Sequence, residues 1–340
     1  MTPLNTYRTT VVAPLIHNTA GLLWRTRNLT FKDQPSYPPA MPRQKHNHQR
    51  PSKRYGAAEL FGRSLIGIAP RELRTLSSTE NRTITCPFKP DRATCHKKGG
   101  VCSLTLYERG EDGSVTVSSP PVTTCPSRFL EGSVVFKWVS QTLLETTDAK
   151  IVNEVSFLMS NQGHEAEEDE VGRIDSVLVR QDNSSLHWCA LEMQAVYFSG
   201  GKMEDDFAVM RRWTDSGLPF PAKQRRPDFR SSGPKRLMPQ LQIKVPTLRR
   251  WGKKMAVVVD NAFWKSLGAM QRTSHISNAD IVWFVIDYEG PTKGRYKLKP
   301  LEAVFTTLEH AVEGLTGGMP VSLEQFEHAI REKLERDGAR

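Results

Sequence analysis

The spacing of apolar residues predicts a set of strands in the second half of the chain. Continuous apolar runs bounded by turn residues are typical of strands buried on both faces, and strict alternation is typical of half-buried strands. Four segments fit these patterns, at residues 173–181, 186–201, 254–260 and 279–290. Together they predict a largely buried sheet.

Apolar residues three and four positions apart predict helices. These helices are expected at residues 55–73, 132–147, 203–213, 237–251, 300–315 and 322–338. Pro246 is expected to end or bend the fourth of them, because proline lacks the backbone N–H that a helix interior uses. Ser322 and Gln325 have the spacing of a capping box at the start of the last one. Since helices and strands alternate after residue 130, we expect a mixed α/β domain.

Composition divides the chain into three predicted parts. Residues 1–53 are rich in proline, asparagine, glutamine and arginine, which predicts a basic, flexible arm without enough apolar surface to order itself. Residues 54–130 hold many turn residues, and the sequence GEDG between two alternating stretches signals a hairpin. Residues 131–340 hold most of the predicted helices and the four strands. We therefore expect a small module followed by a larger α/β domain.

The net charge of +10 is concentrated in two segments. Residues 1–55 carry nine Lys and Arg against one acid, and residues 222–254 carry eleven against one. Such segments favour a polyanionic partner, nucleic acid first of all, although a solvated basic surface without a partner is the alternative. The candidate contacts are Arg225, Arg226, Arg230, Lys235 and Arg236.

The apolar runs also bear on the compartment. No window approaches eighteen consecutive apolar residues, so we expect no membrane-spanning segment. The N-terminus is a poor match to a secretory signal, which predicts a cytoplasmic protein. Because a reducing cytoplasm disfavours disulfides, spaced cysteines there are metal ligands or core residues.

Four cysteines lie within forty residues in turn-forming contexts: Cys86, Cys95, Cys102 and Cys125. Four thiolates suit a tetrahedral site for Zn²⁺ or iron, and the bound ion would stabilise a module that has few apolar residues. The alternative is that these are incidental buried cysteines. Cys189 lies within a predicted strand and is expected to be a core residue.

Two acids interrupt predicted buried strands. Asp175 lies in the strand at 173–181, and Glu192 shares a strand face with Gln194 two residues on. Burying a carboxylate is costly unless it is paired, so two of them favour a cation between them, and Mg²⁺ is the cation that carboxylates and phosphates commonly hold. A further carboxylate, Glu154, precedes them. The alternative is that the acids face solvent from edge strands.

An Asp on one strand and Glu-x-Gln on the next resemble the PD-(D/E)xK nuclease arrangement, with Gln194 where that superfamily usually has lysine. Longer stretches extend the likeness: "TCPF", "TCHKKGGVCSLTLY", "GRIDSVLV", "LEMQAVYFSGG" and "RRPDFRSSGPKRLMPQLQIKVPTLRRWGKKMAVVVD". Together they resemble the NotI family of restriction endonucleases over roughly residues 53 to 310. A neutral amide at position 194 would orient a water rather than take its proton.

The resemblance implies a PD-(D/E)xK core with an accessory four-cysteine module that binds one iron. It also implies a homodimer that cuts GC-rich palindromes in double-stranded DNA with Mg²⁺. Carried over by position, Asp175, Glu192 and Gln194 form the catalytic set, with Glu154 assisting, and Asp175 and Glu192 hold the Mg²⁺. The iron ligands are then the four cysteines of the module: Cys86, Cys95, Cys102 and Cys125.

The expected function is therefore that of a type II restriction endonuclease that leaves 5′-phosphates. A cognate DNA methyltransferase encoded nearby is expected as its partner. Two other functions stay open on the sequence. One is a non-cleaving DNA-binding protein that binds through the cysteine module, and the other is a structure-selective repair nuclease with the same chemistry and no sequence preference.

Overall fold

The computed structural model describes residues 52–80, 83–91, 93–159, 170–183, 185–317 and 321–338. The predicted arm at residues 1–53 falls almost wholly outside these ranges. Residues Gln49–Arg340 group as one unit. Two sheets organise the described residues, one of six strands and one of five, and a two-stranded ribbon accompanies them.

The six-stranded sheet contains a strand from each of the four predicted segments. The strand predicted at 186–201 ends at Met193, because residues 198–200 pair with residues 225–227 instead, so Gln194 lies beyond the strand that carries Glu192. In spatial order its strands are β13 (Arg295–Thr306), β12 (Ile281–Thr292), β11 (Met255–Asp260), β8 (Ser185–Met193), β7 (Glu170–Asp182) and β6 (Lys150–Met159). The strands β12, β11 and β8 are parallel to one another, and the outer strands pair in antiparallel fashion. Every residue of β11 is buried, as its continuous apolar sequence predicts for a central strand covered on both faces. The expected mixed α/β fold is confirmed.

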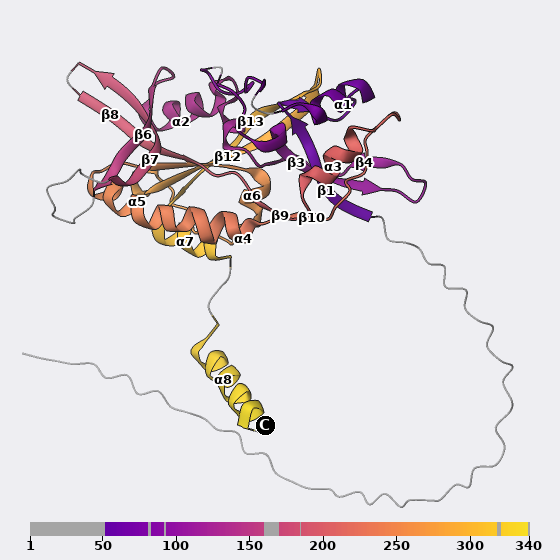
Figure 1. Cartoon of the computed structure of the whole chain (residues 1–340). Coiled ribbons are helices and arrows are strands. Elements are labelled where there is room, and N and C mark those ends of the chain that lie inside the picture. The colour runs from indigo at the N-terminus through magenta and orange to yellow at the C-terminus, as the bar shows by residue number, and fades with distance from the viewer. Residues whose placement is uncertain are drawn as a thin grey trace, which may run out of the picture. The chain divides into compact units, whose positions relative to one another are not determined.

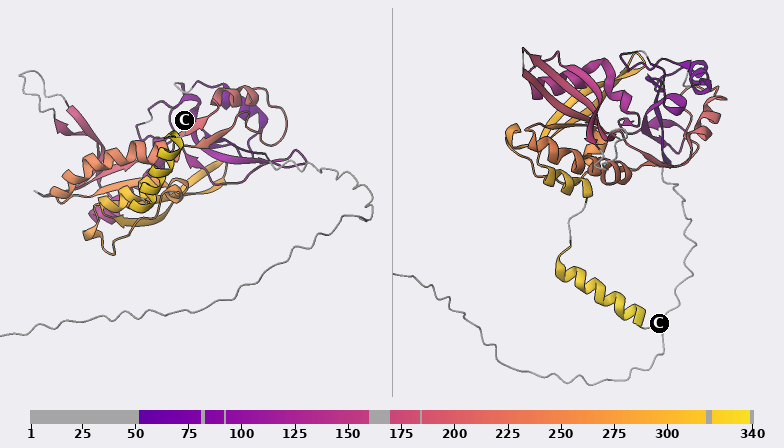
Figure 2. Two further views of the ribbon diagram at one scale, coloured as in Figure 1. Left: turned by 90° about the horizontal axis from the view of Figure 1, so that it is seen from below. Right: turned by 60° about the vertical axis from the view of Figure 1, so that its left-hand side comes forward.

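Helices cover both faces of this sheet (Figure 1). One face packs against α2 (Val134–Leu144), and the other packs against α5 (Met238–Arg250), α6 (Asn261–Ser266) and α7 (Leu308–Thr316). Successive side chains of β12 point to opposite faces of the sheet and so contribute to the hydrophobic core on each face. Trp283 packs on the α5 side and Phe284 on the α2 side. A view from below shows α5 and α7 lying across the sheet (Figure 2).

The five-stranded sheet belongs to the N-terminal module. It consists of β2 (Arg63–Ser64), β1 (Ser52–Leu60), β3 (Val101–Arg109), β4 (Val115–Val117) and β5 (Val122–Thr123). The predicted GEDG hairpin is confirmed between β3 and β4. Helices α1 (Pro70–Ser78) and α3 (Met203–Met210) also contribute, and Phe207 and Met210 of α3 pack against Leu60 and Leu73. The segments 54–130 and 131–340 therefore share a core.

A buried ion pair ties this module to the larger sheet. Arg128 lies in the short helix η3 (Pro126–Ser133), and its Nε donates to both carboxylate oxygens of Glu59 on β1 at 3.0 and 3.2 Å. The same guanidinium donates to Glu131 and to the carbonyl of Tyr296 on β13, each at 3.0 Å. Neither side chain of the Arg128–Glu59 pair is exposed.

Three predicted helices differ from the structure. The segment predicted as helical at 55–73 forms strands β1 and β2 before helix α1 begins at Pro70, because pairing with β3 outweighs its local helical spacing. The segment predicted at 300–315 is strand up to Thr306, and its helix begins after the Thr307 cap. The third, α5, spans the predicted segment and continues past Pro246, so the proline does not end it, and the alternative that it bends the helix stays a prediction.

None of the predicted helices and strands falls within the basic residues 219–236, yet this segment contains short ordered elements. It contains β10 (Arg225–Pro227), α4 (Phe229–Ser232) and most of a π-helical turn, η4 (Gly233–Leu237), and β10 pairs with β9 (Phe198–Gly200). The Asp228 carboxylate caps α4 by accepting from the backbone N–H of Ser231 at 3.0 Å. These elements could not be predicted because the periodicity of apolar residues is recognisable only in longer segments.

The remaining short helices are η2 (Lys98–Gly100) and η5 (Ile276–Asn278), and the C-terminal helix is α8 (Leu323–Gly338). The predicted capping box at the start of α8 is confirmed, with reciprocal hydrogen bonds of 3.1 and 3.2 Å between Ser322 and Gln325. In the ranges that the structure describes, none of the helices combines the length and apolarity that crossing a membrane requires.

Candidate active site

The two predicted acids face each other on neighbouring strands. The antiparallel ladder of β7 and β8 ends at Ser176 and Leu191, and Asp175 and Glu192 lie one position beyond this last pair. Glu192 is buried as predicted, whereas Asp175 is 60% exposed. Residues directly opposite one another in such a pair lie on the same face with their Cβ atoms roughly 5 Å apart. Two carboxylates in this arrangement repel each other unless a cation or a proton compensates them.

Glu192 is a buried carboxylate that is held by helix α5. Its side chain is 5% exposed, and its Oε2 accepts a hydrogen bond from the Lys244 ammonium at 2.9 Å. With the Gln240 amide nitrogen turned toward it, Gln240 donates to both carboxylate oxygens at 2.8 and 3.0 Å. Burial raises the pKa of Glu192 to about 7, Lys244 acts against this rise, and Asp175 adds to it. The two carboxyls therefore interact directly.

A cavity of about 470 Å³ opens at these acids. The predicted catalytic residues Asp175, Glu192 and Gln194 all line it, together with Lys235 and Arg236. The cavity has acids on one wall and basic side chains on another. Such a site is suited to a substrate that carries both a phosphate and a divalent cation.

Gln194 is fixed at the end of β8. Its backbone N–H donates to the carbonyl of Val258 on β11 at 2.9 Å, and its side-chain amide donates to the carbonyl of Ala195. The amide nitrogen is therefore engaged, and the amide oxygen is the group that can accept a hydrogen bond in the cavity. This geometry fits the expected orienting role of Gln194 and not a role as a base.

Glu154 lies on β6 next to this pair, but its side chain points elsewhere. Asn153 pairs with Ser176 and Val155 with Ile174, so Glu154 occupies the position opposite Asp175. Its backbone has a φ of 53°, and its carboxylate is 74% exposed and accepts from Arg173 at 3.3 Å. Glu154 does not appear among the residues that line the cavity. Its predicted assisting role thus remains a prediction.

Arg225 does not fit its predicted role as a DNA contact. The side chain is buried, and its guanidinium forms a bidentate pair with Asp206 at 2.6 and 3.1 Å. Its other hydrogen bonds go to the carbonyls of Gly201, Tyr55 and Lys202. All five N–H donors of the guanidinium are engaged in this way. Arg225 therefore has a structural role, linking β10 to α3 through its ion pair with Asp206.

The four other predicted DNA contacts are exposed: Arg226, Arg230, Lys235 and Arg236. Lys235 and Arg236 line the cavity with the acids. The Arg236 guanidinium stacks on the ring of Tyr197 at 3.7 Å and donates to the Tyr197 hydroxyl at 2.6 Å. This stacking holds a positive charge at the cavity entrance.

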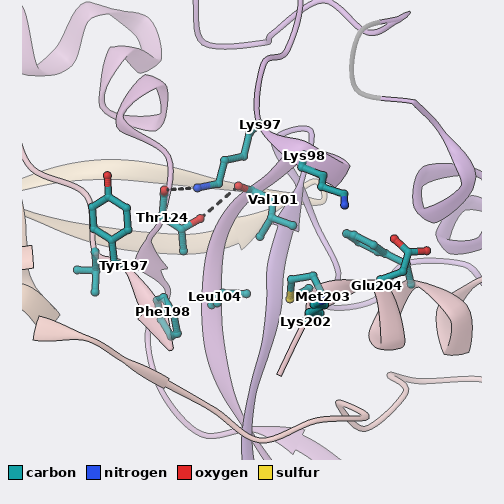
Figure 3. Close-up of a pocket in the computed structure, with 12 residues that line it drawn as sticks. Lys97, Lys98, Val101, Leu104, Thr124, Tyr197, Phe198, Lys202, Met203 and Glu204 are labelled. Carbon is teal, nitrogen blue, oxygen red and sulfur yellow. Dashed lines mark hydrogen bonds between the residues drawn. The ribbon is translucent and has the colours of Figure 1, made fainter. Parts of the chain in front are cut away.

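A second cavity of about 390 Å³ is lined by residues of β3, β9 and α3 (Figure 3). The two share Lys97, Thr124 and Tyr197 as lining residues. Leu104 and Phe198 give the second cavity an apolar floor, and Lys97 donates to the carbonyl of Thr124 at 2.8 Å (Figure 3). A lysine between the second and third cysteines of the module therefore reaches the border of the cavity that holds the acids.

The four predicted cysteine ligands are neighbours. Cys86, Cys95 and Cys102 are buried, and Cys125 is half-buried. Burial raises the pKa of Cys95, and Cys86 and Cys125 raise it further. Across the ranges with described coordinates, however, no three His, Cys, Asp or Glu side chains are grouped so that they could hold a metal ion. The predicted four-cysteine metal site therefore remains a prediction. Cys189 is a core residue, as expected.

Sequence reasoning missed Lys244 and Gln240. They lie four residues apart on α5, so both side chains reach Glu192 from one helix face. A signal was available, because Lys244 stands between Ile243 and Val245 in a helix whose buried residues include Leu241 and Val245. A lysine at such a position needs a buried anion.

The comparisons with known proteins agree with this geometry. A family model described as restriction endonuclease NotI matches residues 72–298, which include both acids, all four cysteines and helix α5. A search of curated proteins finds no match. Since the matched region covers well over half of the chain, the chain belongs to the NotI restriction endonuclease family.

Proposed function

We propose that this restriction endonuclease is a type II enzyme that cuts both strands of a GC-rich palindromic DNA sequence in the presence of Mg²⁺ and leaves 5′-phosphates. Family membership makes the protein a site-specific deoxyribonuclease that binds DNA. The observation that carries the finer proposal is that Asp175 and Glu192 line one cavity together with Lys235 and Arg236.

The donor set at this cavity fits Mg²⁺. Two carboxylates, a backbone carbonyl and phosphate oxygens are hard oxygen ligands of the kind that Mg²⁺ prefers. The residues that would hold it are Asp175 and Glu192, with the carbonyl of Met193, which also lines the cavity. When bound there, the ion would stabilise the negative charge that develops on the phosphate and on the leaving 3′ oxygen.

The chain's own groups then have distinct tasks. The oxygen of the Gln194 amide accepts a hydrogen bond from the attacking water and orients it, since an amide does not take up a proton at neutral pH. Lys235 and Arg236 bind the backbone phosphates around the scissile bond. In this proposal the Glu154 carboxylate, which accepts from Arg173 in the structure, assists from β6 once it turns toward Asp175. In-line attack of this water on the phosphorus forms one P–O bond and breaks the bond to the 3′ oxygen. The water loses its proton to solvent, the 3′ oxygen takes one up from solvent, and the phosphate stays on the 5′ end.

The palindromic site and the homodimer belong together in the proposal. One chain carries one pair of acids, so cutting both strands at one site uses two copies related by a two-fold axis. Guanidinium groups read guanine edges well, which supports GC-rich recognition from the exposed arginines. A cognate methyltransferase would protect the host's own DNA from this activity.

We also propose that the cysteine module binds one iron or zinc ion and that the ion draws the four neighbouring thiols together. Metal analysis of the purified protein should then give about one equivalent of iron or zinc per chain.

Cys95→Ser should lose that ion because the site needs all its thiolates. Cys189→Ala is the matched control, since Cys189 lies in the core next to α2. A protein free of both metals would exclude the proposed ion.

Binding of DNA should depend on salt through the basic wall of the cavity. Lys235→Gln should weaken DNA binding and reduce the slope of log K against log salt concentration by about 0.9, the value for one lost phosphate contact. The comparison is Lys137→Gln, since Lys137 is exposed on α2, which covers the opposite face of the sheet. Equal slopes for both variants, measured by fluorescence anisotropy, would remove Lys235 from the DNA-binding surface.

The proposed function is tested by digesting a GC-rich phage genome with purified protein, with and without Mg²⁺. Discrete fragments that depend on Mg²⁺ are expected, and sequencing their ends gives the site and shows whether the phosphates are on the 5′ ends. Smeared products would favour a nuclease without sequence preference. Intact DNA that still shifts on a gel, tested over several genomes, would count against cleavage.

A further inference from the structure

Lys244 is a buried lysine whose ammonium contacts both acids of the site. Its side chain is 9% exposed, and Nζ lies 2.9 Å from Oε2 of Glu192 and 4.0 Å from Oδ1 of Asp175. A buried ammonium is unfavourable unless an anion pairs with it and accepts its hydrogen bonds. The Glu192 carboxylate meets both needs. The two residues therefore form an ion pair within the site, where the proposed function places a divalent cation.

The Lys244 ammonium comes from helix α5, whereas the Glu192 carboxylate comes from strand β8. Lys244 follows Gln240 by one helical turn, and both donate to the Glu192 carboxylate. Leu241, Val245 and Leu248 bury the same helix against the sheet. The rigid packing of α5 thereby fixes the ammonium relative to β8, and it orients the Glu192 carboxylate in the absence of any metal.

We propose that Lys244 is a positioning residue that serves as an internal counter-ion of Glu192 and competes with the divalent cation for that carboxylate. This inference rests on the proposed function, because it takes Glu192 to be a ligand of the cation. In the metal-free protein the ammonium holds the carboxylate in place. The same ammonium repels a second cation that approaches the same oxygen.

Because of this competition, binding of the divalent cation at the two acids depends on DNA. With Lys244 already paired to Glu192, a divalent cation gains little from the two acids alone. A DNA phosphate in the cavity adds negative charge and oxygen ligands beside Asp175, which favours the cation over the ammonium. The complete cation site therefore forms when DNA is bound and is weak without it.

The test is the thermal unfolding of DNA-free protein across a series of Mg²⁺ concentrations at alkaline pH. A cation that binds the folded state raises its Tm in proportion to its affinity. Lys244→Met should show this rise at Mg²⁺ concentrations about tenfold or more below those that wild type needs. Lys254→Met is the matched control, because Lys254 is partly buried and donates to the carbonyl of Ala279. It should respond to Mg²⁺ as wild type does.

A double variant keeps the test decisive if the single change harms folding. Without divalent cations, Lys244→Met should lower the Tm because it leaves Glu192 without its counter-ion. Adding Glu192→Gln should restore at least half of that loss and should also abolish the response to Mg²⁺. Lys244→Gln, which keeps a donor near Glu192, replaces Lys244→Met if the latter does not fold.

Two results would overturn the inference. One is an equal Mg²⁺ response in wild type and in the Lys244 variant, and the other is a Tm loss that Glu192→Gln does not relieve. Failure of the proposed function has a different signature, since wild type would then not cleave DNA under any Mg²⁺ concentration. Wild type that cleaves DNA normally beside an unresponsive Lys244 variant would reject the role of Lys244 alone.

Discussion

Asp175→Asn is expected to slow DNA cleavage by about a thousandfold or more while leaving the protein folded and able to bind DNA. Asp175 is 60% exposed, so its loss costs little stability. Its carboxylate is half of the pair that would hold the cation, and an amide contributes no charge to that site. The measurement is the single-turnover cleavage rate with saturating Mg²⁺, beside DNA affinity measured without Mg²⁺.

The matched control is Asp182→Asn. Asp182 lies seven residues further along the same strand, is 53% exposed and pairs with Arg180, so its variant should cleave at the wild-type rate. DNA affinity should be unchanged or slightly higher in Asp175→Asn, because one negative charge leaves the neighbourhood of the phosphate. A variant of Asp175 that cleaves within tenfold of wild type would contradict the proposed cation site.

Arg128→Met is expected to lower the free energy of unfolding by about 3–5 kcal/mol. Removing the guanidinium leaves Glu59 as a buried carboxylate without its cation. Ser103 alone would continue to donate to it, at 2.7 Å. The guanidinium also lies 4.5 Å from the ring centre of Phe88, so its loss removes a cation–π contact within the cysteine module. Urea denaturation measures the difference.

Two comparisons separate the buried charge from general damage. Glu59→Gln combined with Arg128→Met removes both charges and should recover part of the lost stability. Arg272→Met breaks an exposed pair with Glu302 and should change the stability by less than about 1 kcal/mol. If Arg128→Met costs no more than Arg272→Met, the buried pair does not join the module to the larger sheet energetically.

The central sheet and its acids could be predicted because their signals are local. Strands β7 and β8 have apolar sequences long enough to identify, and a strand fixes which side chains share a face. An acid inside each strand then points to one site without knowledge of the fold. The register that sets Asp175 opposite Glu192 follows from the antiparallel pairing of β7 with β8, which the sequence does not specify.

Other features depend on contacts between distant segments. Strand β1 has helical spacing, and its pairing with β3, more than forty residues later, decides its structure. Lys244 is fifty-two residues from Glu192, so no local motif joins them. Arg225 looks like its basic neighbours in sequence, yet its pairing with Asp206 buries it. Charge counts cannot distinguish such a residue from an exposed one.

The buried ion pair between Arg225 and Asp206 has a consequence for protein engineering. It fixes the start of the basic segment, and Asp206 also accepts from the backbone N–H of Ala222 at 2.9 Å, so the fold of this region does not depend on the exposed arginines that follow. A combinatorial library confined to Arg226 and Arg230 can therefore explore new sequence preferences on an intact scaffold. A library that included Arg225 would yield mostly unfolded clones.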